Sequence, residues 1–247
     1  MSHSSSLFGS HKIILSDVDS TNNFAAKLLN EGIGGHGSVI MAENQSNGRG
    51  QRGAIWQSEP KLNLLFSIIL CSEQLSKLKP IHINWLVSLC LVDALKEYDI
   101  IACIKWPNDI MIGEKKIAGM LIENKFHGSQ LKQSIVGVGL NVNQVSFEIS
   151  KATSMKLQTG IEYIVEELLN TFVFNFRKNE HMLSISHYNG LKNRYLDHLF
   201  GLNKQRFFKN ESGEFEGKII GIDDSGQLLI ELNGKQKAFH NKQIQFL

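Results

Sequence analysis

A glycine-rich run, GRGQRG at residues 48–53, contains the side chains best suited to bind a charged molecule. It lies between strand-like runs at 38–43 and 64–70 and places Arg49 and Arg52 among three glycines. Glycine lets a loop bring backbone N–H groups close to a ligand, and arginine offers planar donors that fit phosphate and carboxylate oxygens. The run therefore suits an anionic, phosphate-bearing ligand. Taken alone it slightly favours a solvated surface loop, since short Gly/Arg runs are common, but further motifs change that balance.

A second set of polar residues lies in KWPND at residues 105–109 and in the lysines that follow. Asn108 donates and accepts hydrogen bonds, which suits a sugar or a base edge, and Asp109 can hold a divalent metal or orient a cationic partner. Lys115 and Lys116 return across a turn, and alternation lets only one of them point inward. A solvated turn explains Lys115 well. A solvated turn explains Asn108, Asp109 and Lys116 less well, because apolar strand residues flank them.

Two glycines interrupt the strand-like run GVGLNVN at residues 137–143. A glycine inside a strand weakens the strand unless something approaches the backbone closely. A flat ring lying on Gly137 and Gly139, with Asn141 hydrogen-bonded to one edge of the ring, explains the two glycines. A bulge at a sheet edge explains it equally well.

Four other polar residues allow two interpretations each. Ser20, Thr21 and Asn22 are typical of a helix cap, whose N–H groups and hydroxyls also suit a polar ligand head. Gln45 is either an amide ligand or a surface residue. Without the other motifs, a cap alone is the safer interpretation.

Composition limits the class of protein. The 247 residues allow one large domain or a medium domain with a small one, and 42% hydrophobic content is enough for a real core. A net charge of +2 argues against an electrostatic nucleic-acid binder. The three cysteines show no CxxC spacing, which predicts buried thiols in a reducing compartment. We expect a cytoplasmic protein, since neither a membrane-spanning run nor a signal-peptide pattern is visible.

Apolar spacing predicts strands and helices over most of the chain. The expected strands are at 13–18, 38–43, 64–70, 100–106, 109–113, 116–124 and 134–142. The expected helices follow Ser20 or Thr21 up to Gly32 and cover 81–98, 161–179 and 183–196. From 201 on, short β-rich runs alternate with turn clusters, which is typical of a small antiparallel barrel.

Six motifs in this order together resemble the biotin protein ligases (biotin–acetyl-CoA-carboxylase ligases). They are DSTN at 19–22, AENQ at 42–45, GRGQRG at 48–53 with Trp56, KWPND at 105–109, KKIAGMLIE at 115–123 and GVGLNVN at 137–143. The resemblance covers most of residues 13–143, and the β-rich tail agrees in size. One such motif is weak evidence, whereas six in the family's order are strong.

The resemblance implies an α/β (α+β) catalytic domain with a mixed central sheet, like class II synthetases and biotin–lipoate ligases, over residues 1–199. An SH3-like barrel is then expected over 200–247. The implied reaction has two steps. ATP and biotin form biotinyl-5′-AMP and pyrophosphate, and a lysine of a biotin carboxyl carrier domain then attacks the acyl phosphate to form an amide.

Residue roles follow from the same resemblance. The implied catalytic residues are Lys116, Arg49 and Asp109. The implied biotin-binding residues are Ser20, Thr21, Asn22, Gln45, Arg49, Gly50, Gln51, Gly119 and Gly137. The implied ATP-binding and adenylate-binding residues are Arg49, Gln51, Arg52, Trp56, Asn108, Lys116 and Asn141. Asp109 is the implied ligand of Mg²⁺. We expect a monomer or homodimer that binds neither DNA nor membranes.

Two departures from the family carry expectations of their own. Many members have arginine where this chain has Gln51, so a charge near the phosphate is lost and we expect the adenylate to be held less firmly. Some relatives begin with a DNA-binding helix-turn-helix. Only about a dozen residues precede Ile13 here, so we expect the monofunctional type without operator binding.

Two other functions compete with biotin ligation. A lipoate ligase or octanoyl transferase would need a long apolar tunnel, and the transferase would also need a nucleophile; the polar set and GRGQRG favour biotin. A nucleotide-binding regulatory module with an SH3-like interaction barrel explains the glycines and the β-rich tail. It does not explain why Lys116, Arg49 and Asp109 occur in one ordered set.

Overall fold

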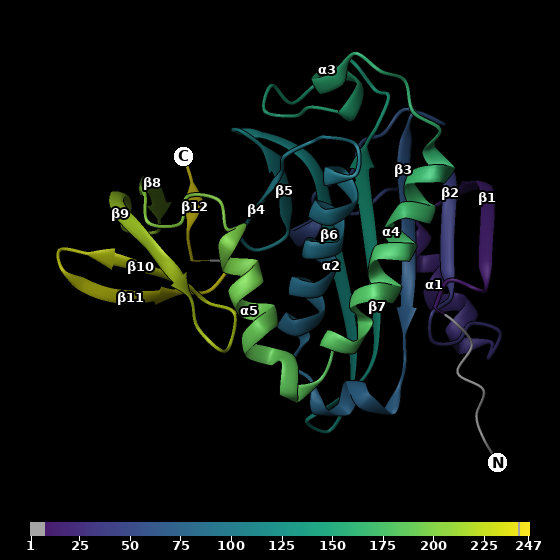
Figure 1. The fold of residues 1–247 in the computed structure, drawn as a ribbon, viewed down its shortest axis with the longest axis horizontal. Coiled ribbons are helices and arrows are strands. Elements are labelled where there is room, and N and C mark those ends of the chain that lie inside the picture. Colours follow the sequence, from purple (N-terminus) through teal and green to yellow (C-terminus); the bar gives the residue numbers. More distant parts are fainter. Residues whose placement is uncertain (1–7, 242) are drawn as a thin grey trace.

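Two β-sheets organise the chain (Figure 1). The computed structural model describes residues 8–241 and 243–247, without the side chains of Arg52, Gln74 and Ile185. The larger sheet has the order β1-β2-β3-β7-β6-β5-β4, with β1 and β2 parallel and the other neighbours antiparallel. Its strands are β1 (Lys12–Val18), β2 (Val39–Gln45), β3 (Asn63–Leu70), β4 (Cys103–Lys105), β5 (Asp109–Ile112), β6 (Lys115–His127) and β7 (Gln130–Asn141).

The smaller sheet lies near the C-terminus and is antiparallel, in the order β11-β10-β9-β8-β12. Its strands are β8 (Gln205–Asn210), β9 (Gly213–Ile222), β10 (Leu228–Leu232), β11 (Lys235–Phe239) and β12 (Gln245–Phe246). In Figure 1 it lies at the left, beside α5. The turn between β9 and β10 reaches the larger sheet, where the Trp106 indole N–H donates to the Gly226 carbonyl at 2.8 Å.

Helices cover both faces of the larger sheet. They are α1 (Thr21–Asn30), α2 (Pro80–Lys96), α3 (Met155–Thr159), α4 (Val165–Asn179) and α5 (Tyr188–Asp197). Short 3₁₀ turns cover Gln51–Gly53, Glu73–Lys77, Glu180–Met182 and Ile185–His187. Figure 1 shows α2 and α4 in front of the sheet. Among the described helices, none is both long and apolar enough to cross a membrane.

β3 explains why the sheet needs helices on both faces, because all eight of its residues are buried. Phe66 packs against Phe172 of α4 in the main core, with ring centroids 4.9 Å apart. Ile69 points the other way and packs with Leu28 of α1 in a second, smaller cluster. Alternation places Ser67 on the α1 face with Ile69, which leaves a polar group under that face.

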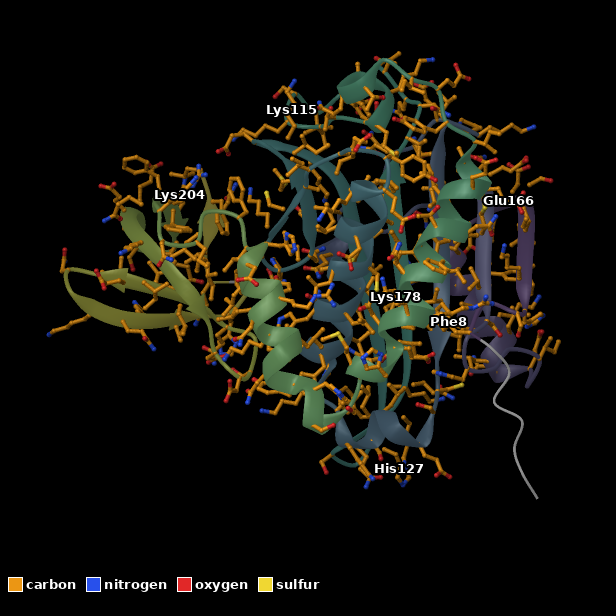
Figure 2. The ribbon with its side chains drawn as sticks, in the orientation of Figure 1. Phe8, Lys115, His127, Glu166, Lys178 and Lys204 are labelled. Carbon is orange, nitrogen blue, oxygen red and sulfur yellow. The ribbon has the colours of Figure 1, made fainter. Side chains whose placement is uncertain are left out.

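β6 is a 13-residue strand that pairs with β7. Together the two strands form the centre of the α1 face of the larger sheet. Figure 2 shows the two ends of β6, Lys115 and His127, at opposite edges of the molecule. A turn at Gly128 leads directly back into β7. The hairpin places Gly119 opposite Gly139, so two strands lack side chains at the same level.

The predicted fold class is confirmed, and several element limits are corrected. The helix predicted over 161–179 begins at Val165, because the Asn143 side chain holds the preceding Tyr163 backbone. Its amide oxygen accepts the Tyr163 N–H at 2.9 Å, and its amide nitrogen donates to the Tyr163 carbonyl at 2.8 Å. The helix predicted over 183–196 begins at Tyr188, after the 3₁₀ turns.

The strand predicted to continue through Trp106 ends at Lys105, and Trp106 to Asn108 form a turn. Polar contacts hold this turn. The Asn108 amide donates to the Met120 carbonyl at 2.7 Å, and the Met120 N–H donates back to the Asn108 carbonyl at 3.0 Å. The domain limit predicted at 199/200 stays a prediction; α5 ends at Asp197 and β8 begins at Gln205.

Core packing on α4 gives a stability prediction with an internal control. Phe172 is 1% exposed, whereas Phe174 on the same helix is 62% exposed. Phe172→Ala removes ring contacts and leaves a cavity, so we expect a loss of about 3–5 kcal/mol of unfolding free energy. Phe174→Ala should change that free energy by no more than about 0.5 kcal/mol. Equal losses in urea unfolding would contradict this packing of α4.

Candidate active site

A cavity of about 430 Å³ opens on the α1 face of the larger sheet. Most of the predicted site residues line it. These are Ser20, Thr21, Asn22, Gln45, Arg49, Gly50, Gln51, Trp56, Asn108, Asp109, Lys116, Gly119 and Gly137. Segments that are far apart in sequence therefore meet at one place.

Glycines form the floor of this cavity. An added Cβ at Gly139 would lie 2.3 Å from the Trp56 indole, and one at Gly137 would lie 2.3 Å from the Asn22 amide oxygen. An added Cβ at Gly119 would lie 3.0 Å from the Lys116 ammonium. No larger residue fits at Gly137 or Gly139 without displacing a cavity side chain.

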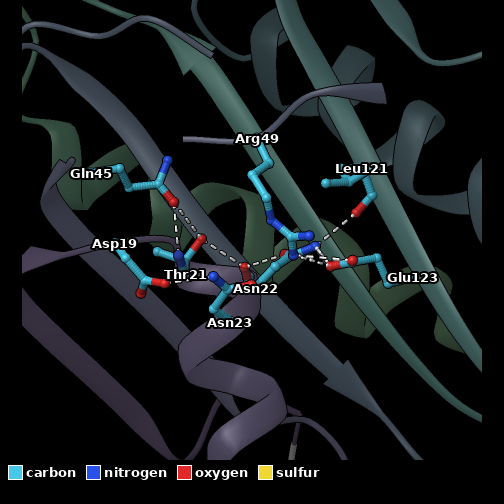
Figure 3. Close-up of polar contacts among 9 residues, drawn as sticks. Asp19, Thr21, Asn22, Asn23, Gln45, Arg49, Leu121 and Glu123 are labelled. Carbon is cyan, nitrogen blue, oxygen red and sulfur yellow. Dashed lines mark hydrogen bonds and ion pairs between the residues drawn. The ribbon is translucent and has the colours of Figure 1, made fainter. Parts of the chain in front are cut away.

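One end of the cavity is a buried hydrogen-bonded network (Figure 3). The Gln45 amide oxygen accepts from the Thr21 N–H at 2.8 Å and from its hydroxyl at 3.1 Å. Ser67, fully buried below, lies 2.7 Å from the Thr21 hydroxyl and 2.6 Å from the Asn22 amide oxygen. Ser20 occupies the cap position of α1, but its side chain makes no capping bond. The predicted cap position at Ser20 is confirmed, but the Gln45 amide oxygen, and not the Ser20 hydroxyl, accepts the N–H of the first helical residue.

Arg49 is held by a carboxylate at the side of this network (Figure 3). One guanidinium nitrogen lies 2.8 and 3.0 Å from the two Glu123 carboxylate oxygens. The Asn22 amide also donates to Glu123, at 2.7 Å. The pair is more than one-third exposed, so it contributes little to stability and can exchange for a stronger anion.

Lys116 and Asp109 form the second charged pair, with 2.7 Å between ammonium and carboxylate. A register irregularity in the β5–β6 pairing explains why Lys116 reaches the cavity. Ile117 and Ala118 both pack into the main core, so strict alternation is broken between them. The irregularity leaves Lys115 exposed at the tip of the hairpin. The prediction that one lysine points inward is confirmed.

The GRGQRG run is a short hairpin loop that covers the cavity. The Gly50 N–H donates to the Ala54 carbonyl at 2.7 Å, and the Trp56 N–H donates to the Gly48 carbonyl at 2.9 Å. The Gln51 side chain accepts a hydrogen bond from the Asn241 amide at 2.8 Å. The C-terminal part of the chain therefore holds the loop. The Arg52 side chain, a predicted ligand, lies outside the described residues.

The opposite end of the cavity contains residues to which the sequence analysis gave no binding or catalytic role. Lys105 lies there, and its ammonium is 4.9 Å from the centre of the Phe246 ring. Burial lowers the pKa of Lys105, and the neighbouring Asp109 carboxylate opposes that change. The C-terminal residues on this wall are Asn241, Ile244, Gln245 and Phe246.

A second cavity, of about 640 Å³, adjoins the first. The two share Trp56 and Lys116, and Lys116 lies 5.5 Å from the centre of the Trp56 ring. The predicted ligand Asn141 lines this second cavity and does not line the first. Its amide nitrogen donates to the Thr153 carbonyl at 2.9 Å.

Sequence reasoning missed Ser67, Glu123, Lys105 and the C-terminal wall. Three of these had a signal, because Lys105 opens the motif KWPND that was already singled out. Ser67 is the one polar residue inside the apolar run LLFSIIL, and Glu123 closes the motif KKIAGMLIE. Nothing in the tail alone indicated that it would reach the cavity, because that contact depends on how the two sheets pack.

Comparisons with known proteins agree with this geometry. The family model described as "Biotin/lipoate A/B protein ligase family" matches residues 15–141, more than half of the chain. A model described as "Biotin protein ligase C terminal domain" matches residues 208–241.

Individual relatives align over nearly the whole chain. The bifunctional ligase/repressor BirA of Bacillus subtilis is 27% identical over 97% of this chain and 75% of its own length. The biotin–[acetyl-CoA-carboxylase] ligase of Paracoccus denitrificans is 29% identical over 88% of this chain and 92% of its own. The Aquifex aeolicus biotin protein ligase solved with biotin and ATP is 27% identical, with a TM-score of 0.81 over 96% of this chain and 99% of its own. The predicted resemblance is confirmed, and the chain belongs to the biotin/lipoate A/B protein ligase family.

Proposed function

We propose that this protein is an ATP-dependent ligase that converts biotin into biotinyl-5′-AMP and transfers it to a lysine of a biotin carrier protein. One observation carries the proposal: a single cavity joins a buried polar network, a glycine floor, and the side chains of Arg49 and Lys116, each paired with a carboxylate. The solved relative that aligns over 96% of the chain was crystallised with biotin and ATP, which supports the same two substrates here.

Biotin fits the polar end of the first cavity. Its ureido group has one carbonyl acceptor and two N–H donors, and the network around Thr21, Gln45 and Asn22 offers both donors and acceptors. The glycines of β6 and β7 let the Trp56 and Asn22 side chains lie close to the sheet, which keeps the cavity above these side chains open for a fused ring. The carboxylate of the extended chain then points along the sheet toward Lys116.

ATP fits across the boundary between the two cavities. Trp56 and Lys116 line both, so a nucleotide in the second cavity can bring its α-phosphate to the first. Asn108 and Asn141 are the proposed nucleotide contacts, together with Gln51 and Arg52. Trp56 offers an aromatic face beside them.

Adenylate formation joins two anions, so its barrier is mainly electrostatic. A biotin carboxylate oxygen attacks the α-phosphorus, the bond from that phosphorus to the bridging oxygen breaks, and pyrophosphate leaves with the electron pair. Lys116 and Arg49 neutralise the charge on the phosphoryl oxygens as the two anions approach. In doing so they exchange Asp109 and Glu123 for phosphate oxygens.

Mg²⁺ is the proposed metal, and Asp109 is its proposed protein ligand. Asp109 is the one Asp or Glu among the described residues that line the first cavity. Mg²⁺ is often held by one or two carboxylates together with substrate phosphates, so this donor set fits. When bound, the ion would neutralise phosphate charge.

Transfer to the carrier uses the same charged pair. The carrier lysine attacks the acyl carbon, the bond from that carbon to the phosphate oxygen breaks, and AMP leaves. Asp109 is placed to orient the incoming amine and accept its proton. The proposed partner is the carrier domain of a biotin-dependent carboxylase. We propose that this chain acts in the cytoplasm as a monomer or homodimer and does not bind DNA.

Lipoate is the main alternative substrate, and the cavity disfavours it. Lipoate has an apolar dithiolane ring where biotin has the ureido group, so it would leave the polar network around Thr21 and Gln45 without partners. We expect biotin to support ATP–pyrophosphate exchange and lipoate to be at least about a hundredfold less effective. Labelled pyrophosphate incorporation into ATP checks this. If lipoate supported ATP–pyrophosphate exchange and biotin did not, the protein would be a lipoate ligase and the proposal would be wrong.

Lys116→Met tests the proposed catalytic lysine. It removes a cation beside the reacting carboxylate, so we expect a fall of about 10²–10³ in the rate of adenylate formation. Lys115→Met is the matched control, because Lys115 is exposed on the same hairpin and outside the cavity. A rate within twofold of the wild type for Lys116→Met would show that this lysine is not catalytic.

Gln51→Arg tests the predicted loose hold on the adenylate. An arginine adds a charge near the phosphate, and a charge-assisted hydrogen bond should slow adenylate release by about tenfold. Asn241→Ala is the control, since it breaks the hydrogen bond to Gln51 without adding a charge. Release of biotinyl-AMP is followed by stopped flow. An unchanged release rate in Gln51→Arg would contradict the prediction.

A further inference from the structure

Lys105 is the cavity lysine for which the proposed reaction gives no role. Arg49 is paired with Glu123 and Lys116 with Asp109. Within the described residues, no ion pair joins Lys105 to a carboxylate. Asp109 lies directly opposite Lys105 in the β4–β5 register, yet its carboxylate contacts Lys116.

The surroundings of Lys105 do not favour a charge unless an anion binds beside it. The side chain is partly buried, and its ammonium lies over the face of Phe246 from the C-terminal sheet. Burial lowers the pKa of Lys105; Lys151 and Lys116 lower it further, and Asp109 and Glu114 act against them. An ammonium that gives up water without a carboxylate partner is costly for the protein.

The order of the strands places Lys105 on the side where the leaving group must depart. Gln45 ends β2, the glycine floor lies on β7 and β6, Asp109 begins β5, and Lys105 ends β4. Neighbouring strands are about 4.8 Å apart, so these positions form a series across the sheet. In the binding mode proposed above, biotin approaches the α-phosphorus from the β2 side. In an in-line displacement the leaving group departs on the opposite side, toward β5 and β4.

We propose that Lys105 is a catalytic residue that binds the β- and γ-phosphoryl oxygens of ATP and stabilises the leaving pyrophosphate. The inference rests on the proposed function and adds a residue for the leaving group. As the bond from the α-phosphorus to the bridging oxygen breaks, the electron pair stays on pyrophosphate and Lys105 donates hydrogen bonds to it. No proton is transferred. Phe246 is a positioning residue, because its ring face holds the ammonium at this wall.

The reverse reaction isolates this role. Synthetic biotinyl-AMP and magnesium pyrophosphate are converted into ATP and biotin, whereas transfer from biotinyl-AMP to a carrier lysine involves no pyrophosphate. For Lys105→Met we expect the KM for pyrophosphate to rise about tenfold or more, as for a lost charge-assisted hydrogen bond. Transfer from biotinyl-AMP and the Kd of biotinyl-AMP should stay within twofold. Lys105→Arg should restore part of the affinity, and Lys115→Met should match the wild type.

The KM for pyrophosphate and the rate of carrier transfer together test the role of Lys105. An unchanged KM for pyrophosphate in Lys105→Met overturns the inference. An equal loss in carrier transfer overturns it too, because Lys105 would then act on the adenylate or on the fold. If Lys105→Met does not fold, Lys105→Gln removes the charge while keeping a donor and carries the same expectations. A wild-type protein that makes no ATP from biotinyl-AMP and pyrophosphate contradicts the proposed function itself.

Discussion

The absence of side chains at the centre of the larger sheet is the constraint on which the site depends. Gly119 and Gly139 face each other across β6 and β7, and Gly137 follows on the same face. Because these glycines lack side chains, Trp56 and Asn22 can pack close to the sheet and the cavity can lie above them. A Cβ at Gly139 would lie 2.3 Å from Trp56, and one at Gly137 would lie 2.3 Å from Asn22. The polar network and the charged pairs surround this cavity.

Charge in the site is arranged as pairs that a ligand can replace. Glu123 holds Arg49, and Asp109 holds Lys116, each across less than 3 Å. Both pairs are partly exposed, where ion pairs contribute little to stability. A phosphate can therefore displace the carboxylates at small cost to the fold. The same pairs keep the long side chains ordered before a ligand arrives.

Local motifs predicted most of the fold and most of the cavity lining. The strands β2, β3 and β7 each contain a clear apolar run, whereas β11 (KQKAF) does not. The predictions that failed depend on contacts between residues that are far apart in the sequence. Asn143 delays the start of α4 from twenty residues away, and an irregularity in pairing with β5 decides that Lys116 faces the cavity. Ser67 and Lys105 gained their importance only when distant segments packed against them, and the ligand roles of all these residues stay predictions.

The position of Phe246 has a practical consequence for handling the protein. The next residue is Leu247, whose N–H donates to the Phe207 carbonyl at 3.1 Å. An affinity tag or fluorescent protein fused directly after Leu247 would therefore begin one residue beyond the wall that supports Lys105. Purified samples labelled there would report altered kinetics that reflect the label, so a removable tag is the better choice for enzymology.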